Sequence, residues 1–250
     1  MSYRTDIAYL YDGSFDGLMC CVYESYYKKE LPFAIFTYEE RQETLFEIKE
    51  IETDQVAARR VEDSIAQRIS KEALKLVHLG FLSRATDREL AILNFLRLGY
   101  KVGQPVTDML ANDAVRTLTK NVQGVQGEGH LYTGFLRFSE YNGALAAIFE
   151  PKNFVLPIVA AHFCNRFPSE HFLIYDKKHK YVFIHQDGEK TLMPLENLEL
   201  PPDSTEEQQY KALWKQFYKT IAIEGRINPK LRQGNMPKHY WKHMTEFMED

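Results

Sequence analysis

The chain has 250 residues, of which 44% are hydrophobic and 26% charged, with a formal net charge of −4. This composition is that of an ordinary globular protein large enough to bury a sizeable core. No stretch approaches the roughly 20 apolar residues of a membrane-spanning helix, and the start lacks a secretory signal, so we expect a cytoplasmic protein without a membrane partner.

The cysteines exclude several kinds of site. Cys20, Cys21 and Cys164 have no C-x-x-C spacing, so they predict neither a disulfide framework nor a zinc or iron–sulfur site. We expect small core residues, and no metal or cofactor in this chain.

The first predicted element is a strand at residues 7–11 that leads into a turn and a helix. Asp12 or Ser14 is placed to cap that helix. Asp12 and Asp16 resemble the aspartates of phosphotransfer enzymes, but the second residue after Asp12 is Ser14 instead of Asp. We therefore interpret Asp12, Ser14 and Asp16 as a shaped turn, which can form a binding site at a β–α junction.

Residues 44–50 predict a second short strand, and residues 53–120 follow a helical pattern. Helix starts are indicated by Thr53–Asp54, by Ser70, and by a capping box formed by Thr86 and Glu89. This segment predicts a helical insert or subdomain between two strand-containing parts.

Residues 121–130 are rich in glycine and predict a connecting loop. The loop resembles phosphate-binding loops but lacks their GK[ST] ending, and a strand is expected after it, at 131–138. Glu128 and His130 form a compact candidate acid/base pair.

The next elements are strands at 144–149, 171–176, 180–186 and 190–193, with a helix at 153–167. His162 and Arg166 lie one helical turn apart, and Asp176 at the end of the following strand is a candidate partner for a buried Arg166. The three residues predict either an internal ion pair or a catalytic pocket that binds an anion, in which His162 exchanges a proton.

The last predicted part is helical, covers residues 204–250 and contains both tryptophans. Residues 208–243 hold eight Lys and Arg residues and one acidic residue, a formal charge of +7, whereas the rest of the chain carries −11. This contrast indicates a polyanion such as nucleic acid, although a solvated basic helix face is the simpler interpretation. His239, His243 and Glu246 have metal-ligand spacing, but the neighbouring lysines oppose a cation, so we expect no metal there.

These elements predict a mixed α/β (α+β) protein with a small sheet, a helical insert at 53–120 and a helical C-terminal part. No serine-hydrolase, zinc-protease or Cys/His nucleophile motif is present.

Several short motifs, in the same order along nearly the whole chain, resemble a bacterial family of unknown function that is associated with DNA metabolism. The motifs are Tyr11–Gly17, Thr53–Asp54, Ala58–Val61, Phe81–Ser83, Gly134–Phe138, His162–Phe167, Arg226–Pro229 and Met236–Trp241. The resemblance implies a role in DNA repair or modification beside a partner enzyme of the radical S-adenosylmethionine class. The iron–sulfur cluster and S-adenosylmethionine are then expected only in that partner. The resemblance also implies an association with uracil-DNA glycosylase-like domains, but Gly103–Val106 lacks the aspartate of the water-activating motif in the common enzymes.

Three functions follow as expectations. The first is a DNA-binding accessory protein, possessing phosphate-binding and base-stacking residues in its C-terminal part; these are Arg226, Asn228, Lys230, Arg232, Lys238, Tyr240, Trp241 and Lys242. The second is an enzyme that acts on a nucleotide or base through His162, Arg166 and Asp176. The third is a protein-interaction module whose aromatic C-terminus never contacts DNA.

Overall fold

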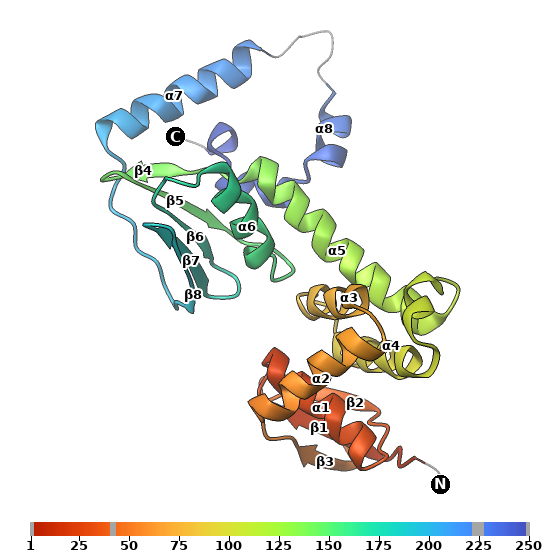
Figure 1. Ribbon diagram of the computed structural model, residues 1–250. Helices are drawn as coiled ribbons and strands as arrows, with labels where there is room; N and C mark the ends of the chain where they lie inside the picture. The colour runs from red at the N-terminus through yellow and green to blue at the C-terminus, as the bar shows by residue number, and fades with distance from the viewer. Residues whose placement is uncertain (1–2, 41–43, 222–227, 249–250) are drawn as a thin grey trace. The chain divides into compact units, whose positions relative to one another are not determined.

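The structure is a computed structural model that describes residues 3–40, 44–221 and 228–248 (Figure 1). The chain forms two compact units, an N-terminal unit of residues 1–125 and a C-terminal unit of residues 126–250. The boundary falls inside one long helix, α5 (Asp113–Phe135). The expected mixed α+β class is confirmed, but the strands in the described part of the chain form two sheets instead of one small sheet.

The N-terminal unit consists of a three-stranded parallel sheet and the helices around it. The strand order is β2-β1-β3. The elements in chain order are β1 (Ile7–Tyr11), α1 (Phe15–Tyr27), β2 (Ala34–Thr37), β3 (Glu47–Glu50), α2 (Gln55–Arg68), α3 (Lys71–Phe81), α4 (Arg88–Val102), the short 3₁₀ helix η1 (Gln104–Asp108) and the start of α5 (Asp113–Phe135).

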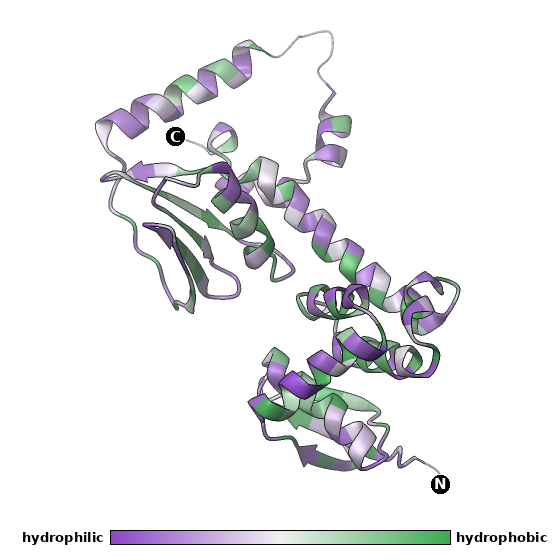
Figure 2. Ribbon diagram, in the orientation of Figure 1, coloured by the Kyte–Doolittle hydropathy of each residue, from purple (hydrophilic) through white to green (hydrophobic). Residues whose placement is uncertain are grey.

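Strand β1 is the centre of this sheet, and every one of its residues is buried. A parallel strand covered on both faces reads as a continuous apolar run, which is why the segment at 7–11 was predictable. Edge strand β3 is charged and only partly covered. Figure 2 accordingly colours β3 largely purple, whereas the buried β6 (Phe172–Asp176) of the C-terminal unit is largely green. Charged edge strands oppose pairing with other chains. Strand β2, with only four residues, has too short a pattern to have been predicted.

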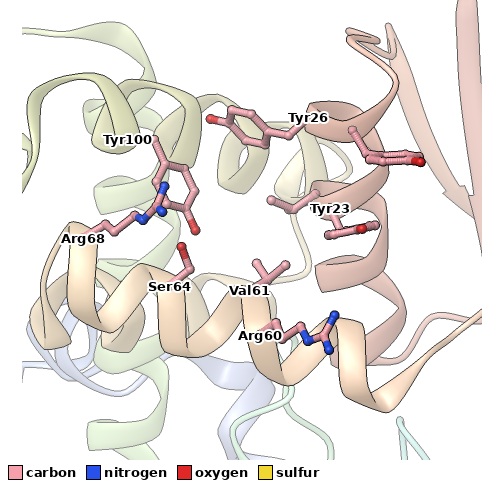
Figure 3. A pocket seen from close by; sticks show the side chains of 9 residues that line it. Tyr23, Tyr26, Arg60, Val61, Ser64, Arg68 and Tyr100 are labelled. Atoms are coloured by element: carbon pink, nitrogen blue, oxygen red, sulfur yellow. The ribbon is translucent and has the colours of Figure 1, made fainter.

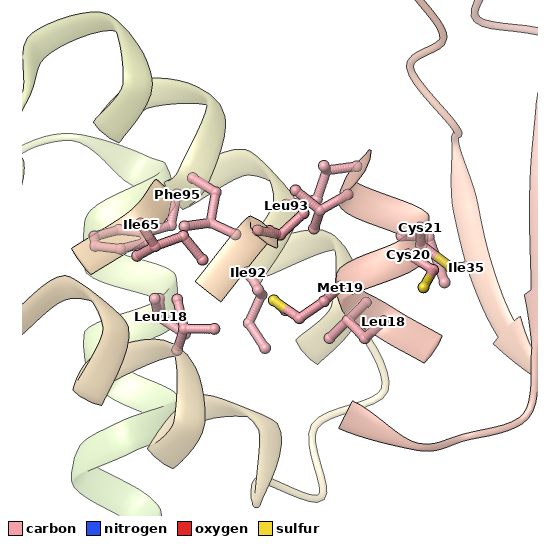
Figure 4. Close-up of a cluster of buried hydrophobic side chains, with 14 of the residues drawn as sticks. Leu18, Met19, Cys20, Cys21, Ile35, Ile65, Ile92, Leu93, Phe95 and Leu118 are labelled. Carbon is pink, nitrogen blue, oxygen red and sulfur yellow. The ribbon is translucent and has the colours of Figure 1, made fainter. Parts of the chain in front are cut away.

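The helices α1, α2 and α4 share one hydrophobic core with the sheet (Figure 4). Met19 of α1, Ile65 of α2 and Phe95 of α4 are all fully buried there. Segment 53–120, expected as a helical insert or subdomain, therefore packs in the same core as β1. All three cysteines are buried and free, as expected.

Two of the three predicted helix starts are confirmed. Asp54 accepts hydrogen bonds from the backbone of Val56 and Ala57, and Ser70 accepts one from Ala73. The capping box at Thr86 does not form. Helix α4 begins after Asp87 without a side-chain cap, and Glu89 is instead buried in contact with other polar groups.

The loop predicted at 121–130 and the strand predicted at 131–138 are wrong, because helix α5 runs through both to Phe135. Val115, Leu118, Val122 and Tyr132 are buried along it at helical spacing. Burial of such a stripe outweighs the cost of glycine, roughly 1 kcal/mol per residue. Gly129 also allows close packing, since a Cβ there would crowd Ile158.

The C-terminal unit contains a five-stranded mixed sheet of order β4-β5-β6-β7-β8, in which only β5 and β6 are parallel neighbours. The strands expected at 144–149, 171–176, 180–186 and 190–193 are confirmed, whereas β4 was not predicted. Its elements are β4 (Ser139–Tyr141), β5 (Ala144–Phe149), α6 (Leu156–Arg166), β6 (Phe172–Asp176), β7 (Tyr181–Gln186), β8 (Glu189–Pro194), α7 (Thr205–Thr220), α8 (Pro229–Asn235) and the 3₁₀ helices η3 (Lys238–His243) and η4 (Thr245–Phe247). Within the part expected to be helical, 204–250, the segment after Pro237 thus forms only short 3₁₀ helices in the described residues.

In the described ranges, no helix combines the length and the apolar character needed to cross a membrane.

Candidate nucleic-acid interface

Exposed cations gather around a pair of stacked aromatic rings near the C-terminus. The rings of Trp241 and Phe247 stack with centroids 4.4 Å apart. The guanidinium of Arg232 lies 5.1 Å from the Trp241 ring, and the Lys238 ammonium lies 6.0 Å from it. Lys230 is exposed two residues before Arg232 on α8. We call these five residues the basic-aromatic cluster.

Trp241 and Tyr240, both predicted to stack on a base, occupy different environments. The half-buried Trp241 indole donates a hydrogen bond to the backbone oxygen of Met236. Tyr240 is only 5% exposed and packs edge-on against Tyr132 and Phe135. Its ring is a core group here and is not available to an outside base.

Two further predicted contact residues have structural partners. Asn228 caps α8 by accepting a hydrogen bond from the backbone of Leu231. The Lys242 ammonium lies 2.6 Å from a carboxylate oxygen of Glu150. Arg226 lies outside the described residues. The predicted surface is therefore reduced to Lys230, Arg232, Lys238 and Trp241.

Glu150 anchors η3 beside the end of β5. Its carboxylate pairs with Lys242 and also lies 3.2 Å from Nε2 of His243. The hydrogen bond from Lys242 lowers the pKa of Glu150. Burial lowers the pKa of His243, although the contact with Glu150 opposes this effect, and burial also lowers the pKa of His239. The sequence held no signal for Glu150, because its partner is 92 residues away.

These two histidines predict a pH dependence of stability. Their pKa values in the folded state lie below the unfolded value of about 6.5, so unfolding takes up protons as the pH falls. The stabilisation they provide is therefore complete above pH 6.5 and is lost progressively below it. We expect a lower free energy of unfolding at pH 5.5 than at pH 7.5 in urea titrations, and a weaker pH dependence in His243→Gln. Exposed His130→Gln is the control; an equal change in both variants would contradict this assignment.

His239, His243 and Glu246 do not converge on a metal position. Glu246 accepts hydrogen bonds from Arg137, at 2.7 Å, and from the Trp214 indole, at 3.0 Å. Burial raises the pKa of Glu246, but the bonds from Arg137 and Trp214 outweigh it and the net shift is downward. The carboxylate is thus saturated by protein donors and ties α7 to η4. Within the ranges covered by the structure, no group of three or more potential ligands could hold a metal ion.

The proposed catalytic trio is not assembled. Asp176 is fully buried, and it accepts bonds from the backbone of Lys178 and His179 and from the His179 ring, the last at 2.7 Å. Arg166 is exposed and lies over the Phe167 ring. Helix α6 runs back between two parallel strands, which places Arg166 at their amino ends and Asp176 at the carboxyl end of β6, about 15 Å along the strand. The expected ion pair between them is therefore not formed. His162 is half-buried, and its Nε2 has no hydrogen-bond partner among the residues that the structure describes.

The predicted turn after β1 is held by its own hydrogen bonds. Ser14 caps α1 by accepting a bond from Gly17. Asp12 accepts bonds from the backbone and hydroxyl of Ser14 and from the Thr53 hydroxyl, at 2.8 Å. Partial burial raises the pKa of Asp12, but these bonds lower it more, so the net shift is downward. Asp16 is not part of this set. The turn links the carboxyl ends of β1 and β3, and a side chain on Gly17 would overlap the Asp12 carboxylate.

Glu128 and His130, the candidate acid/base pair, do not act together. Glu128 is buried and accepts three hydrogen bonds from the loop after β5, whereas His130 is exposed.

Helix α7 exposes an apolar face. Glu207 is its only buried residue. The exposed large apolar side chains are Tyr210, Leu213, Trp214, Phe217 and, at the helix end, Ile221. Monomeric proteins seldom expose such a continuous stripe, so this face is suited to binding a protein.

Comparison with known proteins identifies one family. No curated protein and no solved structure matches the chain. A family model described as a domain of unknown function, DUF4130, matches residues 86–246. The match starts just before α4 and ends within η4, so it includes the whole C-terminal sheet and every residue of the basic-aromatic cluster except Phe247. Because it covers more than half of the sequence, the chain belongs to the DUF4130 family of unknown function.

Proposed function

We propose that this protein is a DNA-binding accessory protein that acts in DNA repair or modification with a partner enzyme of the radical S-adenosylmethionine class. The basic-aromatic cluster is the observation that carries this proposal. The resemblance of the Arg226–Pro229 and Met236–Trp241 motifs to a family associated with DNA metabolism supports it. The iron–sulfur cluster and S-adenosylmethionine would belong to the partner.

The cluster suits a phosphate backbone for two reasons. Lys230, Arg232 and Lys238 are exposed, and no ion pair is recorded for them within the described part of the chain. Packing on Trp241 and Phe247 also restricts the Arg232 side chain, which reduces the entropy lost when its guanidinium binds a phosphate. Lys242, which is paired with Glu150, is expected to contribute less.

Charge reversal of the cluster is expected to weaken DNA binding. The double variant Lys230→Glu/Arg232→Glu should bind single-stranded DNA at least about tenfold more weakly, because two phosphate contacts are replaced by repulsion. The slope of log affinity against log salt concentration should decrease by about 1.4. Fluorescence anisotropy at several salt concentrations measures both quantities.

The control is Lys71→Glu/Lys75→Glu, which changes the net charge equally at two exposed positions of α3. It should leave binding nearly unchanged. Affinity that stays flat between low and moderate salt, or equal losses in the two double variants, would sink the proposal.

A role as a protein-interaction module is the second candidate, and the exposed apolar face of α7 favours it. Leu213→Asp/Phe217→Asp would place charges on that face without altering the basic-aromatic cluster. Loss of capture of the purified radical enzyme with unchanged DNA binding would assign α7 to the partner. If charge reversal at Lys230 and Arg232 abolished only partner capture, the module alone would stand and DNA binding would be rejected.

A further inference from the structure

A hollow lined by tyrosines and arginines lies between α1, α2 and α4 of the N-terminal unit (Figure 3). Its volume is about 500 Å³, within the range of small-molecule sites. Tyr23, Tyr26 and Tyr27 come from α1, Arg60 and Arg68 from α2, and Tyr100 from α4. In the sequence, the only sign of this site is that three tyrosines occur within five residues of α1. The fold is needed to bring the arginines of α2 opposite to them.

The tyrosine rings offer flat surfaces to a ligand. Tyr23 and Tyr27 stack in parallel, with centroids 5.8 Å apart, and Tyr27 is 67% exposed. Tyr26 and Tyr100 meet edge to face at 5.4 Å. Burial raises the pKa of Tyr26 to about 12, so its hydroxyl remains a hydrogen-bond donor at neutral pH. Exposed, ordered aromatic rings of this kind are suited to stacking on bases.

The charge of the hollow is positive. None of the residues that line it is acidic. Arg60 and Arg68 are exposed, and no ion pair is recorded for either within the described ranges. Figure 3 shows Arg68 beside Tyr100, and Arg60 further along the same helix. Guanidinium groups in such positions bind phosphates through paired hydrogen bonds.

A second hollow, of about 390 Å³, shares Tyr26 and Tyr100 with the first. Tyr3, Arg97 and Lys101 complete it. The Arg97 guanidinium lies 4.4 Å from the Tyr3 ring and 5.2 Å from the Tyr26 ring. It also donates a hydrogen bond to the Ser25 hydroxyl, at 3.0 Å. The combination of aromatic rings and a cation thus occurs in both hollows, which share Tyr26 and Tyr100.

We propose that these two hollows, the tyrosine–arginine groove, bind nucleotides whose bases stack on the tyrosines and whose phosphates contact Arg60, Arg68 and Arg97. An unpaired strand and a free nucleotide share this chemistry, and the repeated arrangement fits successive units of a strand. Among the described residues, no carboxyl, thiol or imidazole group lines either hollow. The choice of a nucleic acid as ligand rests on the proposed function. Helices α1 and α2, which supply most of the lining residues, lie outside the region that the family model matches.

The test measures binding of the full chain to a labelled single strand of about ten nucleotides, with dTMP, a matched duplex and polyglutamate as competitors. Tyr27→Ala should weaken strand binding about tenfold through loss of one stacking surface. Arg60→Gln should decrease the salt slope by about 0.7. The neighbouring Arg59→Gln is the matched control, because Arg59 is equally exposed but does not line the groove. Both tested side chains are exposed, so folding should be preserved.

A strand that binds much more tightly than dTMP identifies an unpaired strand as the ligand, and equal affinities identify a free nucleotide; both results support the groove. Losses no larger in Tyr27→Ala and Arg60→Gln than in Arg59→Gln would overturn it, as would equal competition by duplex or polyglutamate. Comparison with Lys230→Glu/Arg232→Glu separates the two sites. If only the cluster variant weakens binding of the DNA strand, the groove is rejected and the cluster stands. If only the groove variants weaken it, the cluster is rejected and the groove stands.

Discussion

Replacing Glu89 by alanine is expected to lower the free energy of unfolding by about 3 kcal/mol, because it breaks a buried ion pair and leaves the partner charge behind. Glu89 is only 3% exposed. Its carboxylate lies 2.7 Å from the Arg88 guanidinium and accepts a hydrogen bond from the Tyr11 hydroxyl, at 3.0 Å. Burial raises the pKa of Tyr11, which keeps that hydroxyl protonated. The bond from Arg88 to the Ser83 carbonyl survives the change and limits the loss.

Urea denaturation followed by far-ultraviolet circular dichroism measures this effect. Glu62→Ala removes a more exposed carboxylate, paired with His78, and should cost less than about 1 kcal/mol. The double variant Arg88→Met/Glu89→Leu removes both charges and should lose less than Glu89→Ala alone. If the single and double variants were equally unstable, the unpaired charge would not be the cause.

Glu128→Ala should destabilise the C-terminal unit by about 2 kcal/mol, because it leaves three partly buried N–H donors without their acceptor. The Glu128 carboxylate accepts bonds from the backbone of Lys152 and Asn153, at 2.7 and 2.8 Å, and from the Asn153 amide, at 2.6 Å. These bonds join α5 to the loop between β5 and α6. Glu128→Gln keeps one acceptor oxygen and should recover part of the loss.

Tryptophan fluorescence is the suitable probe, because Trp214 and Trp241 both lie in the C-terminal unit. Glu199→Ala, at an exposed loop position, should change the free energy of unfolding by less than about 0.5 kcal/mol. An unchanged transition in Glu128→Ala would show that water satisfies these donors and that the clamp contributes little.

Local signals predicted much of the fold. Strand β1, the caps at Asp54 and Ser70, and strands β5 to β8 follow from patterns confined to a few neighbouring residues. Capping and short-range alternation are local interactions, so they can be recognised without knowing the fold.

Errors occurred where tertiary contacts opposed local preference. The glycines around Gly127 indicated a loop, yet burial of Val122 and Tyr132 keeps α5 helical through them. The sequence placed Glu89 in a capping box. In the structure its carboxylate instead forms an ion pair with Arg88 and accepts a hydrogen bond from Tyr11. In each case the free energy of contacts with residues distant in the sequence exceeded a local preference of about 1 kcal/mol.

The candidate sites show the same division. The sequence showed that the C-terminal part is positively charged, but only the fold shows which cations are paired. Lys242 pairs with Glu150, whereas Arg232 and Lys238 remain exposed beside Trp241. Nothing local indicated that Tyr240 is a core residue, or that Arg166 lies at the opposite end of the strands from Asp176.

By itself, the sequence determined the α+β class, most strands and helix starts, the free cysteines and the basic, tryptophan-containing C-terminal part, since all of these depend on composition or on residues close together in the chain. Only the tertiary structure decided the division into two units, the length of α5, which cations remain exposed, and the meeting of Tyr26 and Tyr100 with Arg60 and Arg97. These features depend on contacts between distant segments, whose burial and pairing energies exceed the preferences of any single residue.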